Sequence, residues 1–193
     1  LLRHTFPILE RFCFRSDFTF GSTKLTHPKD NIEALSEFVR RHGYLKTVEV
    51  GGELFRNCEF LLAISGCDEL EELILRDFCY NCFDFSHLQN LSKLKILKIR
   101  FDGDLYGLCD RSQCEDIDFS RALQSLKTVE ISEVGDRYAV PNHIYDVLSQ
   151  LQNLCELRLR SCYVNDIPWT RLTQLRKVHL TKGLVEKSCG SHL

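Results

Sequence analysis

Apolar residues recur along the chain in one spacing: a first apolar residue, a second three positions later, and a third two positions after that. Side chains of a β-strand alternate between its two faces, so the second and third residues of each triplet point to the same side of a strand. Each triplet therefore predicts a short strand with one apolar face. The seven triplets are Leu9-Phe12-Phe14, Leu45-Val48-Val50, Leu70-Leu73-Leu75, Leu94-Leu97-Ile99, Leu126-Val129-Ile131, Leu154-Leu157-Leu159 and Leu175-Val178-Leu180.

The spacing between triplets is close to regular. Their first residues are 36, 25, 24, 32, 28 and 21 positions apart, and leucine makes up 30 of the 193 residues. Four of these intervals fall within the period of roughly 20–29 residues of a leucine-rich repeat, and the other two equal one period plus an insertion. A single unit of this kind cannot bury its own apolar face, so units stack and share a continuous core.

These intervals predict an α/β fold, a leucine-rich repeat solenoid of about seven irregular repeats in a single domain over residues 1–193. We expect a horseshoe with a parallel β-sheet on its concave side and helices on its convex side. An ordinary α/β sandwich with leucine-rich strands is the alternative. The expected strands lie near 11–15, 47–51, 72–76, 96–100, 128–132, 156–160 and 177–181, with insertions at 16–29 and 101–116.

Helical spacing of apolar residues predicts helices over 31–41, 55–64 and 144–151, and a single turn over 166–173. Asp30 lies three positions before Glu33, which predicts a capping box at the start of the first helix. The chain has no Met, and no helix precedes the first strand. We therefore expect it to be part of a longer protein.

Composition narrows the functional classes. Lys and Arg number 25 and Asp and Glu 27, a net charge of −2, which argues against a nucleic-acid partner. The longest apolar run, Phe60 to Ile64, is far shorter than the roughly 20 residues that cross a bilayer, so no membrane association is expected. Because the phosphate-binding, zinc-protease and nucleophile-elbow motifs are all missing, we expect no enzymatic activity and no cofactor.

The ten cysteines are scattered through the repeats rather than clustered at the ends. This distribution favours reduced thiols and a cytoplasmic or nuclear location. Cys162 occupies the Asn/Cys position of the repeat consensus, where we expect it to point inward. Cys79 and Cys82 form a C-x-x-C pair near His87 that could be half of a zinc site or a redox pair. A second pair is missing, so no metal site is predicted.

The residues next to the inward positions, at places three, five and seven of each motif, are expected on the concave surface. Together they carry eight bases and four acids, a net charge of +4. We expect this face to bind an acidic or mixed-charge protein segment. A solvated sheet with interleaved salt bridges is the alternative. The candidate partner-binding residues are Arg11, Arg15, Glu49, Glu72, Arg76, Lys98, Arg100, Glu130, Glu156, Arg158, Arg160, Lys177 and His179.

The repeats that begin at Leu70 (LEELILRDFC) and Leu154 (LCELRLRSC) resemble those of F-box leucine-rich repeat proteins. The resemblance implies repeats that hold a protein substrate for a cullin-type ubiquitin ligase and direct it to ubiquitin-dependent degradation. It also implies a ligase adaptor bound to an F-box upstream of Leu1. Two further alternatives are the sensor repeats of a nucleotide-binding immune receptor and a ribonuclease-inhibitor-like binder. A small zinc-binding or redox protein that uses Cys79 and Cys82 is a third.

Overall fold

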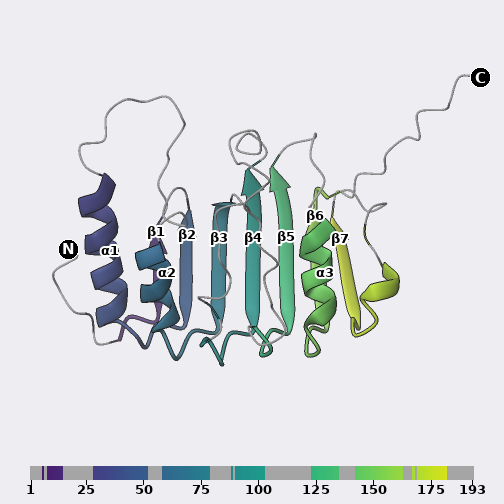
Figure 1. The fold of residues 1–193 in the computed structure, drawn as a ribbon, viewed down its shortest axis with the longest axis horizontal. Helices are drawn as coiled ribbons and strands as arrows, with labels where there is room; N and C mark the ends of the chain where they lie inside the picture. The colour runs from purple at the N-terminus through teal and green to yellow at the C-terminus, as the bar shows by residue number, and fades with distance from the viewer. Residues whose placement is uncertain are drawn as a thin grey trace, which may run out of the picture.

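The computed structural model describes residues 6, 8–14, 28–51, 58–78, 88, 90–102, 123–134, 142–162, 167 and 169–181 of the chain. These residues form one sheet with helices on one side of it (Figure 1). The strands are β1 (Arg11–Phe14), β2 (Thr47–Gly51), β3 (Glu72–Phe78), β4 (Ile96–Asp102), β5 (Thr128–Val134), β6 (Glu156–Arg160) and β7 (Lys177–Thr181). The helices are α1 (Pro28–Arg41), α2 (Cys58–Ser65), α3 (Asn142–Gln150) and a 3₁₀ turn (Trp169–Arg171).

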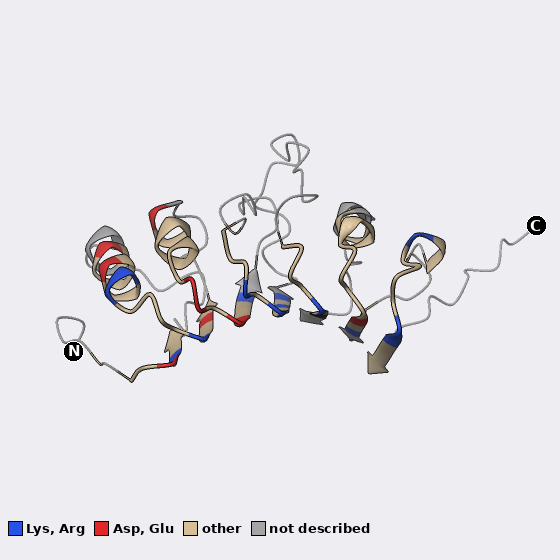
Figure 2. Ribbon diagram, turned by 90° about the horizontal axis from the view of Figure 1, so that it is seen from below, with Lys and Arg blue, Asp and Glu red and all other residues tan. Residues whose placement is uncertain are grey.

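The seven strands are all parallel and lie in sequence order, each hydrogen-bonded to the next along the chain. The fold is therefore α/β with an all-parallel sheet, as the triplets predicted. Figure 2 shows the strands along an arc, with α1, α2 and α3 all on its outer side. The side of the sheet that faces away from these helices is the inner side of this arc, and we call it the concave face.

Inward residues from successive strands stack in register. Each strand begins two positions after the first leucine of its triplet. The second and third triplet residues then form two continuous apolar rows beneath the sheet. One row is Phe12, Val48, Leu73, Leu97, Val129, Leu157 and Val178, and the other is Phe14, Val50, Leu75, Ile99, Ile131, Leu159 and Leu180. Between β2 and β6 every member of both rows is buried, whereas β7 leaves Val178 and Leu180 about half exposed.

The same backbone turn precedes every strand. The N–H of each first leucine donates to the carbonyl three residues earlier, with N···O distances of 3.0–3.2 Å in all seven cases. Those carbonyls belong to Phe6, His42, Cys67, Leu91, Leu123, Leu151 and Leu172. Buried backbone groups need such partners, so the turn lets the chain enter the sheet without leaving its N–H groups unpaired.

A second backbone pattern joins neighbouring strands at their N-terminal edge. The carbonyl of the residue before a strand accepts two N–H groups from the start of the next strand, at N···O distances of 2.8–3.0 Å. This happens at six successive positions: Glu10, Lys46, Glu71, Lys95, Lys127 and Cys155. These equivalent hydrogen bonds start all seven strands at the same position along the sheet, and the apolar side chains of neighbouring strands are therefore aligned.

His42 is a polar residue at an otherwise apolar position. The equivalent residues in the other described turns include Cys67 and Leu91, and all three side chains are buried. The Phe6 N–H donates to Nε2 of His42 at 2.9 Å, so the proton of the neutral ring is on Nδ1, which donates to the Phe38 carbonyl at 2.7 Å. Both ring nitrogens are thereby satisfied, and the ring ties residue 6 to the end of α1.

Several predicted boundaries differ from the structure. Helix α1 begins at Pro28, so Asp30 lies inside it and the predicted capping box is wrong. Proline fits the first helical turn because N–H groups there have no helical partner. Strand β4 continues through Asp102, so the first two residues of the predicted insertion 101–116 belong to the sheet. The rest of that insertion, and residues 16–27 of the other, lie outside the described residues.

Candidate partner-binding face

The concave face carries three rows of side chains, at places three, five and seven of the motifs. The strand register aligns these places across the sheet, except at place seven between β3 and β4, where the register shifts after Leu75–Ile99. Row three is Arg11, Thr47, Glu72, Ile96, Thr128, Glu156 and Lys177; row five is Cys13, Glu49, Ile74, Lys98, Glu130, Arg158 and His179. Row seven is Gly51, Arg76, Arg100, Ser132, Arg160 and Thr181. Twelve of the thirteen candidate residues therefore share one face, and Arg15 lies outside the described residues.

Charge on these rows is uneven. The described candidates comprise seven bases and four acids, a net charge of +3. All four acids lie in rows three and five. Row seven, at or within two residues of the C-terminal ends of the strands, holds Arg76, Arg100 and Arg160 with only small residues at its other described places. We call these three residues the arginine row.

Glu49 is placed on the face as predicted, but it is not available to a partner. Its side chain is only 2% exposed and lies between two arginines. Its carboxylate accepts from Arg76 Nε at 2.5 Å and from Arg11 Nη2 at 3.4 Å. A buried carboxylate requires such partners because removal of a charge from water is costly. We therefore expect Glu49 to act by positioning Arg11 and Arg76, and its part in binding a partner stays a prediction.

Two further acids are paired within the face. Lys98 Nζ lies 2.8 Å from Glu72 on the neighbouring strand. Glu156 accepts from Arg158 Nε at 3.0 Å, and His179 Nε2 lies 2.9 Å from the same oxygen. The hydrogen bond from Arg158 lowers the pKa of Glu156 from its usual value of 4.5, against the opposing effect of burial. These contacts make Glu72 and Glu156 parts of local ion pairs.

Three exposed bases of the concave face take no part in these ion pairs. Among the described residues, Arg100, Arg160 and Lys177 make neither a hydrogen bond nor an ion pair through their side chains, although the charge of Lys177 acts on Glu156 from a distance. Glu130 also has no ion pair there, and it lies between Lys98 and Arg158 in row five. Unpaired basic charge is therefore concentrated on β4, β6 and β7.

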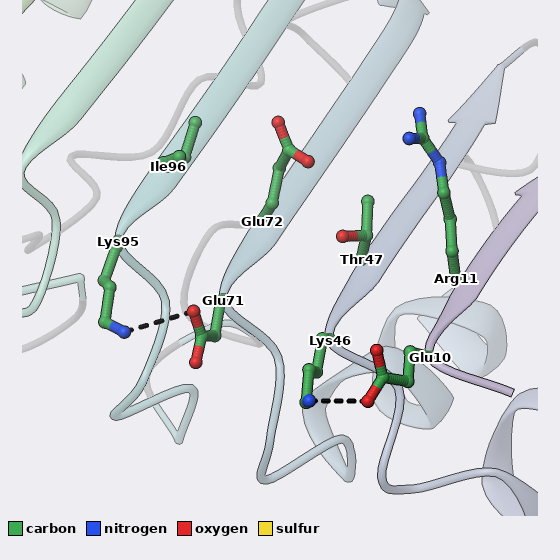
Figure 3. A pocket seen from close by; sticks show the side chains of 8 residues that line it. All are labelled: Glu10, Arg11, Lys46, Thr47, Glu71, Glu72, Lys95 and Ile96. Atoms are coloured by element: carbon green, nitrogen blue, oxygen red, sulfur yellow. Dashed lines mark hydrogen bonds and ion pairs between the residues drawn. The ribbon is translucent and has the colours of Figure 1, made fainter. Parts of the chain in front are cut away.

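A hollow surrounded mainly by charged residues lies at the N-terminal edge of β1–β4 and was not predicted (Figure 3). Its lining includes two ion pairs from the residues just before the strands: Lys46–Glu10 at 2.6 Å and Lys95–Glu71 at 3.1 Å. The hydrogen bond from Lys46 to Glu10 raises the pKa of Lys46. The alternation of Glu and Lys at this place in four successive motifs is visible in the sequence and could have indicated the hollow.

The described cysteines have different surroundings. Cys162 is buried and its Sγ lies 3.6 Å from the Ile131 carbonyl oxygen, so the predicted inward orientation is confirmed. Cys67 is also buried, whereas Cys13 is exposed in row five. The pair Cys79 and Cys82, with His87, lies outside the described residues. Among the described residues, no three His, Cys, Asp or Glu side chains gather in a way that could hold a metal ion.

None of the described helices is long and apolar enough to cross a membrane. Among known proteins, the sequence matches no family model and no curated protein. Its function is therefore inferred from the chemistry of the concave face.

Proposed function

We propose that this chain is a protein–protein interaction module, a leucine-rich repeat solenoid that binds a segment of a partner protein on its concave face. The proposal is supported most by the three rows of side chains, which place twelve candidate residues on the concave face of one sheet. Solenoids use extended concave surfaces of this kind for binding. The seven equivalent turns and the six equivalent edge carbonyls support the repeat interpretation.

Electrostatics favour a partner segment with more acidic than basic residues. The described candidates on the face have a net charge of +3, whereas the whole chain has a net charge of −2. A local field of this kind steers an oppositely charged partner and selects against a like-charged one. The ion pairs of Glu72 and Glu156 fit the interpretation of a partly salt-bridged sheet, so a partner engages mainly the bases that are left unpaired.

Site-specific photo-crosslinking tests whether the concave face binds a protein. A photoreactive residue is placed at Glu130, in the middle of row five, and in a matched sample at Glu37, which is 54% exposed on α1 on the opposite side. We expect protein adducts from position 130 that excess unlabelled chain suppresses, and few from position 37. Adducts from position 37 alone, or equal adducts from both, would overturn the proposal.

The proposed cellular role is substrate recognition for a ubiquitin ligase of the F-box type, in the cytoplasm or nucleus. Its support is the resemblance of the repeats at Leu70 and Leu154 to those of F-box proteins. Purification of the full-length protein from cells, followed by quantitative mass spectrometry, tests this role. We expect a cullin-type scaffold and its adaptor at near-equal amounts. Their absence would remove the ligase role and leave the binding module standing.

A further inference from the structure

The chemistry of row seven differs from that of the other two rows of the concave face. We propose that the arginine row, Arg76 with Arg100 and Arg160, is the place where an extended acidic segment of the partner protein binds. The inference rests on the proposed function, since it names the partner's chemistry and the residues that read it. It makes a sharper claim than net charge, because it assigns the partner to Arg100 and Arg160, which have no partner among the described residues, and to the donors that Arg76 keeps beyond its contact with Glu49.

Arg158 and Arg160 show the distinction on a single strand. Both are exposed, and both lie on the concave face of β6. Arg158 Nε already donates to Glu156 at 3.0 Å, so a partner carboxylate there competes with an acid of the chain itself. Arg160 makes no side-chain hydrogen bond or ion pair among the described residues, and its guanidinium donors are available to a partner. Arg100, two strands away in the same row, is in the same state.

Arg76 completes the row in a fixed position. Its Nε contacts the buried carboxylate of Glu49 at 2.5 Å, and its side chain stays 30% exposed. The register of β3 and β4 shifts between Leu75–Ile99 and Phe78–Phe101, so Arg76 and Asp77 of β3 together span the place opposite Arg100. A guanidinium binds a carboxylate through two parallel N–H donors. An arginine that is already held by Glu49 loses less conformational entropy when it does so.

The dimensions of the row suit an extended peptide that crosses the strands. Arg100 and Arg160 are two strands apart, roughly 10 Å at a strand spacing of about 4.8 Å. Side chains on one side of an extended peptide repeat about every 7 Å, and long arginine side chains accommodate the difference. Ser132, between the two arginines in the register, leaves room for the peptide backbone.

A protein segment fits this row better than a nucleic acid. Nucleic-acid binders neutralise many phosphates with many bases. Here Arg100 and Arg160 are the unpaired bases of the described row, and the chain as a whole is acidic. An acidic peptide needs only two or three charge-assisted contacts, with its other groups against the neutral parts of the face.

Binding of a synthetic peptide tests the inference. The probe is a fluorescein-labelled peptide of about ten residues that alternates Glu and Ser, measured by fluorescence anisotropy with the 193-residue chain. We expect R160Q and R100Q each to weaken binding by about fivefold or more. A control variant, R40Q, removes the same charge from α1, and the double change E69Q with K93Q removes an exposed ion pair outside the three rows without altering the net charge. We expect both controls to stay within about twofold of the parent chain.

The outcomes separate this inference from the proposed function. If R160Q and R100Q bind like R40Q, the arginine row is not the recognition site, even where crosslinks from position 130 persist. Tighter binding of a single-stranded RNA of equal length than of the acidic peptide would also overturn the inference. Circular dichroism confirms that each variant is folded. Arg100 and Arg160 lie on different strands. If one variant fails to fold, the binding affinity of the other still tests the inference.

Discussion

Ser36 and Ser125 differ in the hydrogen bonding of their hydroxyls. Ser36 on α1 is fully buried, and its hydroxyl has no hydrogen-bond partner among the described residues. Ser125 donates to the Leu94 carbonyl at 2.7 Å. Burial of an unpaired hydroxyl is costly, whereas loss of a formed bond costs about 1 kcal/mol. In urea denaturation we expect Ser36→Ala to leave the free energy of unfolding unchanged or raise it, and Ser125→Ala to lower it by about 1 kcal/mol. The reverse order would contradict the assigned hydrogen bonds.

Cys67 is expected to be chemically inert in the folded chain. Burial, with a smaller contribution from Asp68, raises the pKa of its thiol from 9.0 to about 12. The thiolate is the reactive form, so alkylation requires a group that ionises near the working pH. We expect iodoacetamide at about pH 8 to label the exposed Cys13 and spare Cys67 until the chain is unfolded. Peptide mapping by mass spectrometry reports both sites, and equal labelling of the native chain would contradict this expectation.

The same thiol makes stability depend on alkaline pH. In the unfolded chain Cys67 titrates near 9.0, and in the folded chain its pKa is about 12. Between these values the unfolded state loses a proton that the folded state keeps, so the free energy of unfolding falls as the pH rises through this window. We expect Cys67→Ala to show a shallower fall over the same range. A parallel decline in both proteins would mean that other groups cause it.

Glu49 marks the limit of prediction at the residue scale. Its place on the concave face follows from strand alternation and could be predicted. Its burial could not, because the arginines that pair with it are 38 and 27 positions away in the chain. His42 is similar, since its bond to Phe6 joins residues 36 positions apart. Sequence periodicity shows which way a side chain points, whereas pairing depends on which rows the fold brings together.

At the scale of the strand, Val129 and Val178 test how much the position in the sheet matters. Both occupy the same inward row, on β5 and β7. Val129 is fully buried, and Val178 is 43% exposed. The cost of truncation follows the apolar contact that is lost and the cavity that remains. We expect Val129→Ala to lower the free energy of unfolding by about 2 kcal/mol and Val178→Ala by less than about 1 kcal/mol. Equal losses would mean that β7 is covered as fully as β5.

Strand β6 carries an acid-sensitive cluster. The hydrogen bond from Arg158 lowers the pKa of Glu156, and the charges of Arg158, His179 and Lys177 act in the same direction. A carboxyl with a lowered pKa in the folded state stabilises the fold above its usual pKa of 4.5. That contribution disappears as the pH falls through the lowered value. We therefore expect Glu156→Gln to flatten the acid limb of the stability profile, and an unchanged limb would contradict this role.

The strands were predicted more accurately than the start of the first helix, and the difference has a physical reason. The parallel strands follow from the triplet spacing, because burial of a shared core requires it in every repeat. The start of α1 does not follow from apolar spacing. The first N–H groups of a helix have no helical partner, so a helix can begin at a residue whose side chain accepts from them or at a proline, which has no N–H. Pro28 and Asp30 both meet this condition, and the helix begins at Pro28. The hollow at the N-terminal edge was missed because half of its lining, Glu10, Lys46, Glu71 and Lys95, comes from residues just before the strands, which the face prediction omitted.

At the scale of the whole molecule, the described strands follow one another across the sheet in sequence order, and we expect stability to be graded along them. Each strand is hydrogen-bonded only to its neighbours in sequence, so β1 and β7 each have one partner among the described strands and the central strands have two. Strand β7 adds to this an inward face that is half exposed. In such stacks stability is a sum of repeat terms and nearest-neighbour terms.

Native-state hydrogen exchange measures this gradient directly. We expect the slowest amides in β3, β4 and β5, where both neighbours and a buried core are present, and the fastest strand amides in β7 and β1. Val129 on β5 lies between Leu97 of β4 and Leu157 of β6. Val129→Ala should therefore speed amide exchange in β4, β5 and β6 more than in β1, because it removes contacts between these three strands. Uniform exchange in all seven strands would instead mean that the sheet opens as one cooperative unit. The ends would then be held as firmly as the centre.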